Sequence, residues 1–308
     1  MKAAVYKKYG APEVLQITEV EKPQPKDNEL LVKIEAATVT SGDVRLRGSD
    51  FPPLFWLPAR LIFGLFRPKK RILGHELSGT VEAVGSKVTK FKVDDTVLGT
   101  TTMLKTGSYA EYICLPETWK QGVVVHKPEE LSFKQAATLP VGGMTALFLL
   151  KKGGLKKGMD VLVYGASGSV GSYALQIAKT YGAKVTTVSS ASNFKMLQSL
   201  GADAMLDYEK EDYTEKNQAF DIVFDAVGKT SKSRAKKVLK SNGIFLSVKS
   251  ITAEKTVLLQ EIVDLTLKGK IKPFIDQEFS LNQIIDAHRY VETGRKRGNV
   301  IIHIPNRD

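Results

Sequence analysis

The middle of the chain alternates short apolar segments with longer amphipathic ones. Apolar segments of strand length lie at residues 161–164, 184–190, 204–208, 220–228 and 243–248. The segments between them, for example 172–182 and 194–200, carry apolar residues at helical spacing. Strands that alternate with helices in this way pair in parallel, so the pattern predicts an α/β fold with a doubly wound sheet.

The first 125 residues follow a different pattern. Alternating stretches such as LLVKIEAATV at 30–39, rich in Val and Thr, predict a mostly antiparallel β domain with few helices. The helix and strand alternation begins after the segment 128–140. A helix is expected at 258–269, and an amphipathic helix at 279–294 with a strand at 298–304 ends the chain.

A glycine-rich turn follows the apolar segment at 161–164. The sequence VLVYGASGSVG contains Gly165, Gly168 and Gly171 and leads into an amphipathic helix. Such glycines allow a tight turn, a close approach of the backbone to a ligand and close packing of the helix on the strand. The helix N-terminus offers N–H groups and a positive dipole to a pyrophosphate, so the sequence predicts a dinucleotide site here.

Six segments together point to one protein family. They are MKAAVYKKYG at the start, ILGHELSGTVEAVGSKVTKFKVDDTVLG at 72–99, GSYAEYICLPE at 107–117, AATLPVGGMTAL at 136–147, YGASGSVG at 164–171 and AHRYVETGRKRGNVII near the end. In content and order they resemble the medium-chain dehydrogenase/reductase superfamily, and within it the zinc-free quinone oxidoreductase branch. The resemblance implies a Rossmann dinucleotide-binding domain at 126–271. It also implies a GroES-like β catalytic domain, discontinuous in sequence, made of 1–125 and 272–308.

The end of the second strand of the Rossmann domain decides which cofactor is expected. Enzymes that use NAD place Asp or Glu there to bind the ribose 2′-hydroxyl. This chain has Ser189, Ser190 and Ser192 and no carboxylate, so NADPH is the expected cofactor. By resemblance, Tyr208 lies beside the adenosine phosphate, and Asn193 stands where many relatives carry a lysine.

The remaining cofactor residues come from the glycine turn and from strand ends. By resemblance Thr145 lies near the nicotinamide, and Gly228 and Ser247 stand at strand ends, where an open α/β sheet binds its ligand. The full expected set is Thr145, Gly165, Ser167, Gly168, Ser169, Val170, Gly171, Ser189, Ser190, Asn193, Tyr208, Gly228 and Ser247.

No metal site is expected. A catalytic zinc needs three protein ligands, and a structural zinc site needs four closely spaced cysteines. The resemblance places one cysteine ligand of the zinc enzymes at Thr40 and their histidine ligand at His75, and their second cysteine position in LPVGG holds none. Because Cys114 is the only cysteine, hydrogen-bond donors must take over the polarisation of a substrate carbonyl.

Four polar residues are candidate catalytic groups: Thr40, Asp43, His75 and Tyr112. They come from segments that line the cleft in relatives, and hydride transfer requires a donor near the oxygen that becomes negative. Each has a structural alternative. In these alternatives, Thr40 only ends a strand and Asp43 only caps the TSGD turn. His75 would then be a buried histidine that bonds to the backbone, and Tyr112 would pack in the core.

The segment 51–66, FPPLFWLPARLIFGLF, is apolar and aromatic and is followed by the basic sequence RPKKR. We expect Phe51, Phe55 and Trp56 to line a substrate pocket, as a lid over a lipophilic quinone or enone. Ordinary core packing is one alternative. A patch for a partner or a membrane surface is the other.

Composition limits the remaining function classes. A chain of 308 residues with 43% hydrophobic and 25% charged residues is typical of a globular protein with two domains. The net charge of +12 is compatible with binding the phosphates of a cofactor, nucleic acid or an anionic membrane surface. The basic run at 229–240 fits the solvent face of a helix, with Ala235, Val238 and Leu239 on its apolar side, so nucleic acid is disfavoured as a partner.

The sequence also gives expectations for cellular location and for assembly. One cysteine forbids an internal disulfide, and the sequence shows neither a signal peptide pattern nor a membrane span, so a cytoplasmic location is expected. The segment between 248 and 258 is shorter than in relatives that pair two cofactor domains through an added strand. A homodimer therefore stays open.

The leading hypothesis is a zinc-independent, NADPH-dependent reductase that transfers hydride to quinones or α,β-unsaturated carbonyl compounds. A metal-free alcohol or aldehyde dehydrogenase is an alternative from the same class. An RNA-binding or scaffold protein with a cofactor-bound Rossmann domain is an alternative from another class.

Overall fold

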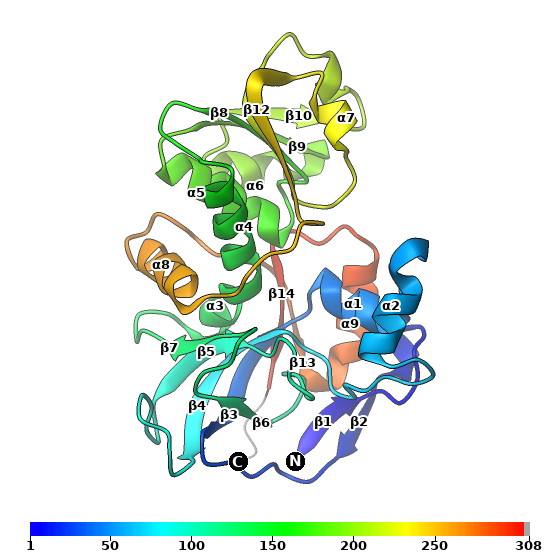
Figure 1. The fold of residues 1–308 in the computed structure, drawn as a ribbon, viewed down its shortest axis with the longest axis vertical. Coiled ribbons are helices and arrows are strands. Elements are labelled where there is room, and N and C mark those ends of the chain that lie inside the picture. Colours follow the sequence, from blue (N-terminus) through cyan, green and yellow to red (C-terminus); the bar gives the residue numbers. More distant parts are fainter. Residues whose placement is uncertain (305–308) are drawn as a thin grey trace. The chain divides into compact units, whose positions relative to one another are not determined.

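The computed structural model describes residues 1–304, apart from the side chains of Leu54 and Phe55. The chain divides into two compact units, which we call unit 1 (Met1–Pro140 with Ile275–Asp308) and unit 2 (Val141–Phe274). Figure 1 labels their helices and strands.

The first boundary between the units lies later than the sequence pattern placed it. We expected the change at 125/126, and it lies at 140/141, while the second boundary lies at 274/275 in place of 271/272. The short helix α3 (Phe133–Ala137) explains the difference. Its Ala137 packs with Ala36 and Ile301 of unit 1, and the Ser78 hydroxyl donates a hydrogen bond to the Phe133 carbonyl, so this segment belongs to the β unit.

Unit 2 contains a five-stranded sheet in the order β10-β9-β8-β11-β12. Its strands are β8 (Asp160–Tyr164), β9 (Lys184–Ser189), β10 (Ala204–Asp207), β11 (Phe220–Asp225) and β12 (Leu239–Ser247). All neighbours pair in parallel, with the first strand in the centre, which confirms the doubly wound α/β prediction. Its helices are α4 (Pro140–Lys152), α5 (Ser169–Thr180), α6 (Phe194–Ser199), α7 (Lys232–Ala235) and α8 (Thr256–Leu267).

The lysine-rich helix expected across 229–240 is much shorter than predicted. Only Lys232–Ala235 is helical, and Leu239 already begins β12. Ala235 and Val238 are buried as expected, but the backbone near Val238 has joined the sheet, because the Phe220 N–H donates to the Val238 carbonyl at 2.8 Å. Pairing with β11 therefore overrides the local helical pattern.

Unit 1 is a largely antiparallel β structure with a seven-stranded sheet in the order β13-β14-β3-β4-β5-β7, and β6 pairs with β3. These strands are β3 (Glu29–Thr38), β4 (Glu76–Val84), β5 (Thr96–Thr100), β6 (Tyr112–Pro116), β7 (Val124–His126), β13 (Ile275–Ser280) and β14 (Asn299–His303). β1 (Lys2–Val5) and β2 (Gln16–Glu19) form a separate pair. The helices are α1 (Ser41–Gly48), α2 (Pro53–Phe63), α3 and α9 (Ile284–Glu292).

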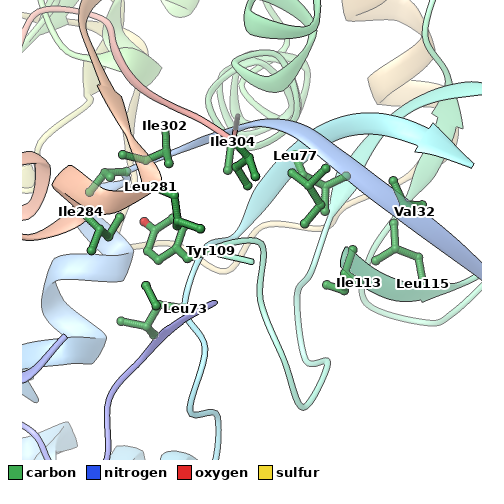
Figure 2. Packing of buried hydrophobic residues seen from close by; sticks show 14 of the residues in the cluster. Val32, Leu73, Leu77, Tyr109, Ile113, Leu115, Leu281, Ile284, Ile302 and Ile304 are labelled. Atoms are coloured by element: carbon green, nitrogen blue, oxygen red, sulfur yellow. The ribbon is translucent and has the colours of Figure 1, made fainter. Parts of the chain in front are cut away.

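The C-terminal segment returns to unit 1, as the resemblance implied, because β14 pairs antiparallel with β3. The expected helix at 279–294 begins only at Ile284, since 275–280 forms the unpredicted strand β13. Figure 2 shows side chains from distant segments, including Leu73, Tyr109 and Ile302, packed together in the core of this unit. Single 3₁₀ turns lie at Pro12–Val14, Ala191–Asn193, Tyr213–Glu215 and Leu281–Gln283.

Within residues 1–304, no helix combines the length and the apolar composition that crossing a bilayer requires.

Candidate functional site

The glycine turn lies at the carboxyl end of the central strand β8. Gly165 has φ +77°, a conformation that other residues rarely adopt. A Cβ on Gly165 would lie 2.4 Å from a Val227 methyl group, and one on Gly171 would lie 2.3 Å from the Gly165 carbonyl oxygen. Both positions therefore require glycine, because the turn, the 226–228 loop and the start of α5 pack too closely for any side chain.

The N-terminus of α5 is arranged to receive an anion. Gly168 occupies the N-cap, and within the described chain no side chain caps this helix. Its first-turn N–H groups, at Val170 and Gly171 for example, cannot find partners inside the helix. A Cβ at Gly168 would meet only the Gly165 carbonyl oxygen, at 3.8 Å, so the approach to these groups is open. The turn fits a pyrophosphate.

Hydroxyl and amide groups gather at the end of β9. The Ser190 and Ser192 hydroxyl oxygens are 3.0 Å apart, and the Asn193 side-chain amide donates to the Ser190 hydroxyl at 3.0 Å. The Tyr208 N–H donates to the Ser189 carbonyl at 3.2 Å, so Tyr208 follows β10 beside this group, with its side chain exposed. Three of the predicted cofactor residues, Ser190, Asn193 and Tyr208, thus lie at one edge of the sheet.

The nearest carboxylate in the strand register is Asp207, opposite Ser189. Asp207 is buried, and its Oδ1 accepts a hydrogen bond from the Glu209 N–H at 3.1 Å. Its side chain therefore serves the turn after β10. The exposed groups at the end of β9 remain hydroxyls and an amide.

Asp225 is a positioning residue that the sequence reading missed. It is fully buried at the end of β11, and its Oδ1 accepts from the N–H groups of Val227, Gly228 and Lys229 at 3.3, 2.8 and 3.3 Å. Its Oδ2 accepts from the Ser247 hydroxyl at 3.0 Å. Asp225 thereby ties together Gly228 and Ser247, both expected at the site. A carboxylate at the last residue of a buried strand and three residues before a glycine was the available signal.

Thr145 lies on α4, close in sequence to a contact with the glycine turn. One turn earlier, a Cβ on Gly142 would come within 2.3 Å of the Ser169 hydroxyl oxygen. The first turn of α4 therefore packs against the start of α5, and Thr145 follows at half-buried exposure on the next turn. Ser167, Ser169 and Val170 belong to the glycine turn itself.

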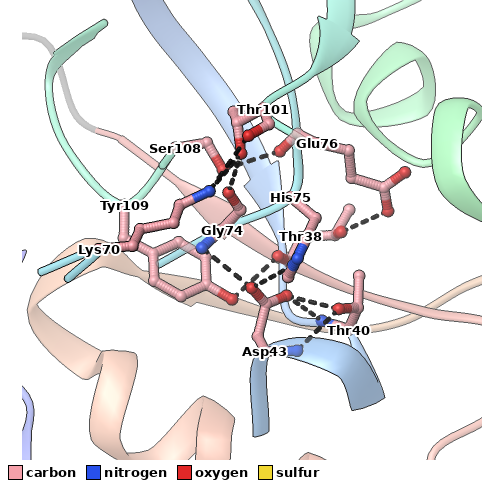
Figure 3. A network of polar contacts seen from close by, with 10 residues as sticks. All are labelled: Thr38, Thr40, Asp43, Lys70, Gly74, His75, Glu76, Thr101, Ser108 and Tyr109. Carbon is pink, nitrogen blue, oxygen red and sulfur yellow. Dashed lines mark hydrogen bonds and ion pairs between the residues drawn. The ribbon is translucent and has the colours of Figure 1, made fainter. Parts of the chain in front are cut away.

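In unit 1, Thr40, Asp43 and His75 form one hydrogen-bonded cluster (Figure 3). Thr40 is the N-cap of α1, and Asp43 completes a capping box with it. Asp43 Oδ2 accepts from the Thr40 N–H at 2.9 Å and from its hydroxyl at 2.6 Å. Asp43 Oδ1 lies 2.7 Å from His75 Nδ1 and accepts from the Gly74 N–H at 2.9 Å.

The charge state of Asp43 fixes the orientation of His75. Burial raises the pKa of Asp43, but the nearby His75 and the hydrogen bonds from His75 and Thr40 outweigh it, so the pKa lies well below its ordinary value. An ionised carboxylate only accepts hydrogen bonds, so His75 Nδ1 carries the proton of this bond. Nε2 is then the ring nitrogen left for a substrate, and the side chain is 23% exposed while that of Asp43 is fully buried.

A second polar group lies behind this cluster and was not anticipated. The Arg47 side chain is fully buried; it donates to Glu292 Oε1 at 2.7 Å and lies 3.4 Å from His288 Nδ1. Burial is the main cause that lowers the pKa of His288, to about 4, so this histidine is neutral at pH 7. The Tyr109 ring contacts His288 edge-on, and its hydroxyl donates to the Thr38 carbonyl at 3.1 Å.

Comparison with known proteins agrees with the fold. Residues 26–129 match the alcohol dehydrogenase GroES-like domain, and residues 169–270 and 249–302 match two models described as zinc-binding dehydrogenase. The 2-methylene-furan-3-one reductase of Solanum lycopersicum is 34% identical over 98% of this chain and 79% of its own length. The chain belongs to the medium-chain dehydrogenase/reductase superfamily.

Further relatives place this superfamily member among its oxidoreductases. The NADPH-dependent alkenal/one oxidoreductase of Arabidopsis thaliana is 30% identical over 98% of this chain and 79% of its own length. The quinone oxidoreductase structure from Coxiella burnetii aligns with a TM-score of 0.84 at 27% identity and covers 99% of both chains. These similarities confirm the predicted family and support a nicotinamide cofactor.

Among the residues that the structure describes, no three His, Cys, Asp or Glu side chains lie close enough together to hold a metal ion. Cys114 lies on β6, and burial raises the pKa of its thiol to about 11, which disfavours the reactive thiolate. His75, which the resemblance placed at the histidine ligand of the zinc enzymes, has its Nδ1 2.7 Å from Asp43 Oδ1.

The other expected site residues are not part of the Asp43 cluster. Tyr112 begins β6, and its ring centroid lies 3.9 Å from Lys22 Nζ. The structure therefore does not bring it into the cluster with His75. Phe51 stacks on Phe63, with ring centroids 5.9 Å apart. Trp56 lies on α2 and is 42% exposed, which is inconsistent with core packing, and the Phe55 side chain lies outside the described residues.

Proposed function

We propose that this protein is an NADPH-dependent reductase of quinones or α,β-unsaturated carbonyl compounds that works without zinc. The observation that carries the proposal is the pairing of His75 with the buried carboxylate of Asp43. It orients the His75 ring so that Nε2, when it carries a proton, donates a hydrogen bond, at the position where the resemblance places the histidine ligand of the zinc enzymes. Relatives named as alkenal/one oxidoreductase and quinone oxidoreductase support the substrate class.

NADPH fits the residues of unit 2 better than NADH. The α5 N-terminus fits the pyrophosphate, and the hydroxyl and amide groups of Ser190, Ser192 and Asn193 can donate to a 2′-phosphate. An acidic side chain at this edge would repel that phosphate. Tyr208 is exposed beside the same edge, where its ring can cover the adenosine end.

The bound cofactor supplies the hydride, and the residues of the chain manage charge and protons. We propose that His75, protonated on both ring nitrogens, donates its Nε2–H to the substrate oxygen that becomes negative, and that Thr40 supports Asp43 from the other side. Asp43 accepts the Nδ1–H and holds the ring in one orientation, as a positioning residue. Asp225 plays the corresponding role in unit 2, because it fixes the loop that carries Gly228.

Absence of zinc is part of the proposal. Among residues 1–304, His75 has too few neighbouring His, Cys, Asp or Glu side chains to form a metal site. The purified protein should contain no stoichiometric zinc, and a chelator should leave turnover unchanged. One zinc per chain, with activity lost to the chelator and restored by the metal, would falsify this part.

A cofactor-oxidation assay tests the reaction. The full-length protein is mixed with NADPH and a panel of quinones, enones and aldehydes, and the loss of NADPH absorbance is followed. Alcohols are tested separately with NADP⁺, and the gain of NADPH absorbance is followed. We expect turnover with quinones or enones. Gly171→Val serves as the matched control, since its side chain would collide with the Gly165 carbonyl and close the turn. Turnover restricted to alcohols with NADP⁺, or no turnover at all, contradicts the proposal.

We also propose the cytoplasm as the compartment, because a chain with Cys114 as its single cysteine suits a reducing environment.

A further inference from the structure

Helix α2 turns its single charged side chain inward and leaves several apolar side chains exposed. Its one charged residue, Arg60, points toward the rest of unit 1: the guanidinium lies 4.0 Å from the Tyr9 ring centroid and donates to the Ser49 hydroxyl at 3.1 Å. The Tyr9 hydroxyl donates to the carbonyls of Phe63 and Gly64 at 3.0 and 2.9 Å. These contacts fix the rotation of the helix about its axis.

The opposite face of α2 is apolar and exposed. Leu57, Leu61 and Ile62 are 54%, 57% and 56% exposed, and Phe66, just past the helix, is 86% exposed. Leu57 and Leu61, four residues apart, lie one above the other on the helix. Ile62 lies about 100° further round from Leu61, also exposed. A helix at the surface of a soluble protein normally presents the reverse arrangement, with its apolar stripe inward. A contiguous apolar patch of this kind marks an interaction site.

Basic residues border this apolar face, which we call the α2 face (Leu57, Leu61, Ile62 and Phe66). The Lys69 ammonium donates to the Leu61 carbonyl at 2.9 Å, so its charge lies at the end of the helix. The Tyr6 N–H donates to the Arg71 carbonyl at 2.9 Å, which brings the N-terminal segment alongside. The exposed basic residues of these segments are Lys7, Lys8, Arg67, Lys69 and Arg71.

Acidic residues are scarce in the same stretch. Asp50 is the only carboxylate from Val44 to Gly74, whereas the sequence from 67 to 71 alone is RPKKR. An exposed apolar helix side with a cationic border has the composition of helices that lie in a membrane interface. Positive charge beside the apolar face adds attraction to anionic lipid headgroups.

We propose that the α2 face and its basic border dock this protein on the surface of an anionic lipid bilayer. The charge pattern selects this occupant over a second copy of the chain, because close packing of two identical faces brings like charges together. The docking is peripheral: the apolar side chains enter the boundary between headgroups and acyl chains, and the basic side chains meet the headgroups. It goes beyond the proposed reaction and does not depend on it.

Co-sedimentation of the full-length protein with vesicles tests the proposal. Binding is expected with phosphatidylcholine vesicles that contain roughly 30% phosphatidylserine, and it should weaken as salt is added. Pure phosphatidylcholine should bind several-fold more weakly. No sedimentation with the anionic vesicles overturns the proposal.

Tryptophan fluorescence gives a second readout. The chain has two tryptophans, Trp56 and Trp119. Trp119→Phe removes one hydrogen bond, to the Thr102 carbonyl, and leaves Trp56, which is on α2 and 42% exposed, as the sole reporter. A blue shift of its emission on addition of anionic vesicles is expected. An unchanged spectrum in a protein that sediments with the vesicles assigns the contact to another surface and overturns the proposal.

Matched variants separate this face from general charge and hydrophobicity. Leu61→Ser with Ile62→Ser should weaken vesicle binding by about ten-fold. Ile251→Ser with Val257→Ser, at exposed apolar positions of unit 2, should not. Arg67→Gln with Arg71→Gln should weaken binding by about five-fold per charge, while Lys236→Gln with Lys237→Gln, which changes the net charge equally, should have little effect. If the control variants in unit 2 lose as much vesicle binding as the variants at the α2 face and its basic border, the proposal is overturned.

Two further outcomes assign the face to another occupant. If the wild type is a dimer without vesicles and Leu61→Ser with Ile62→Ser makes it a monomer, the face is covered by a second copy. If the same variant raises the KM for a quinone without vesicles and still binds them fully, the face serves as a substrate lid. Either outcome overturns the proposal. The first does not depend on the reductase reaction, whereas the second is measured only once that reaction is confirmed.

Discussion

Replacing Asp43 by Asn should destabilise unit 1 well beyond the loss of one ordinary hydrogen bond. Each carboxylate oxygen of Asp43 accepts from a backbone N–H: Oδ1 from Gly74 at 2.9 Å and Oδ2 from Thr40 at 2.9 Å. An asparagine has one oxygen and one NH₂ group, so in either orientation its NH₂ group faces a backbone N–H. An unsatisfied buried donor costs about 1–3 kcal/mol, and hydrogen bonds to a charged group contribute about 1.5–3 kcal/mol. We therefore expect a loss of roughly 3 kcal/mol at pH 7.

The assay is equilibrium unfolding in urea followed by tryptophan fluorescence. Trp56 and Trp119 both lie in unit 1, so the signal reports the unit that contains Asp43. Asp50→Asn is the matched control, because Asp50 is exposed and its replacement should change stability by less than about 0.5 kcal/mol.

The effect should also depend on pH in a defined direction. The pKa of Asp43 is lowered in the folded state, so its stabilisation is complete above the unfolded value of about 4 and declines as the pH falls below it. The difference between wild type and Asp43→Asn should therefore be constant from pH 7 to 5 and shrink below about pH 4. A difference below about 0.5 kcal/mol at pH 7, or one that does not shrink in acid, refutes the reasoning.

Three other predictions concern the cofactor, the reaction and a buried histidine. Ser190→Asp should weaken NADPH binding and favour NADH through repulsion of the 2′-phosphate, whereas Ser190→Ala should cost less; equal dissociation constants for the two cofactors in the wild type at fixed salt contradict the cofactor assignment. His75→Asn and His75→Phe should lower turnover by about 10²-fold and change its profile between about pH 5 and 9, and unchanged turnover in a folded variant that binds NADPH leaves His75 without a role in the reaction. Since burial lowers the pKa of His288 from 6.5 to about 4, wild-type stability should fall as the pH decreases through that interval, and His288→Leu should flatten this decrease in urea unfolding; parallel curves for the two proteins contradict it.

The sequence carried the elements that have strong local signals. The strand before Gly165, the turn and the helix after it were predictable because apolar periodicity and glycine spacing are local properties. The polar edge at Ser190 was predictable for the same reason, since the identity of the residue after the second strand is visible in the sequence. The family's motif positions located His75 and Thr40.

The remaining features depend on contacts between distant residues. Arg47 and His288 are both fully buried side by side, although α1 and α9 belong to opposite ends of the chain. A basic residue on a short helix is ordinarily solvent-exposed, so the pattern gave no indication of this pair. The helix predicted across 229–240 does not extend to Val238 for a similar reason, because the backbone there bonds to β11.

The return of the C-terminus to unit 1 has a consequence for synthesis on the ribosome. The edge of β3 at Ala36–Thr38 pairs with β14, which emerges only after the whole of unit 2 has been made. At about 5–20 residues per second, that edge waits on the order of 10–50 s for its partner. Unit 2 is contiguous and has every strand of its sheet before then, whereas unit 1 must hold an unpaired strand edge in a crowded cell. A nascent chain released before residue 299 therefore carries a complete nucleotide-binding unit attached to an open sheet, which is a substrate for chaperones and a template for aggregation.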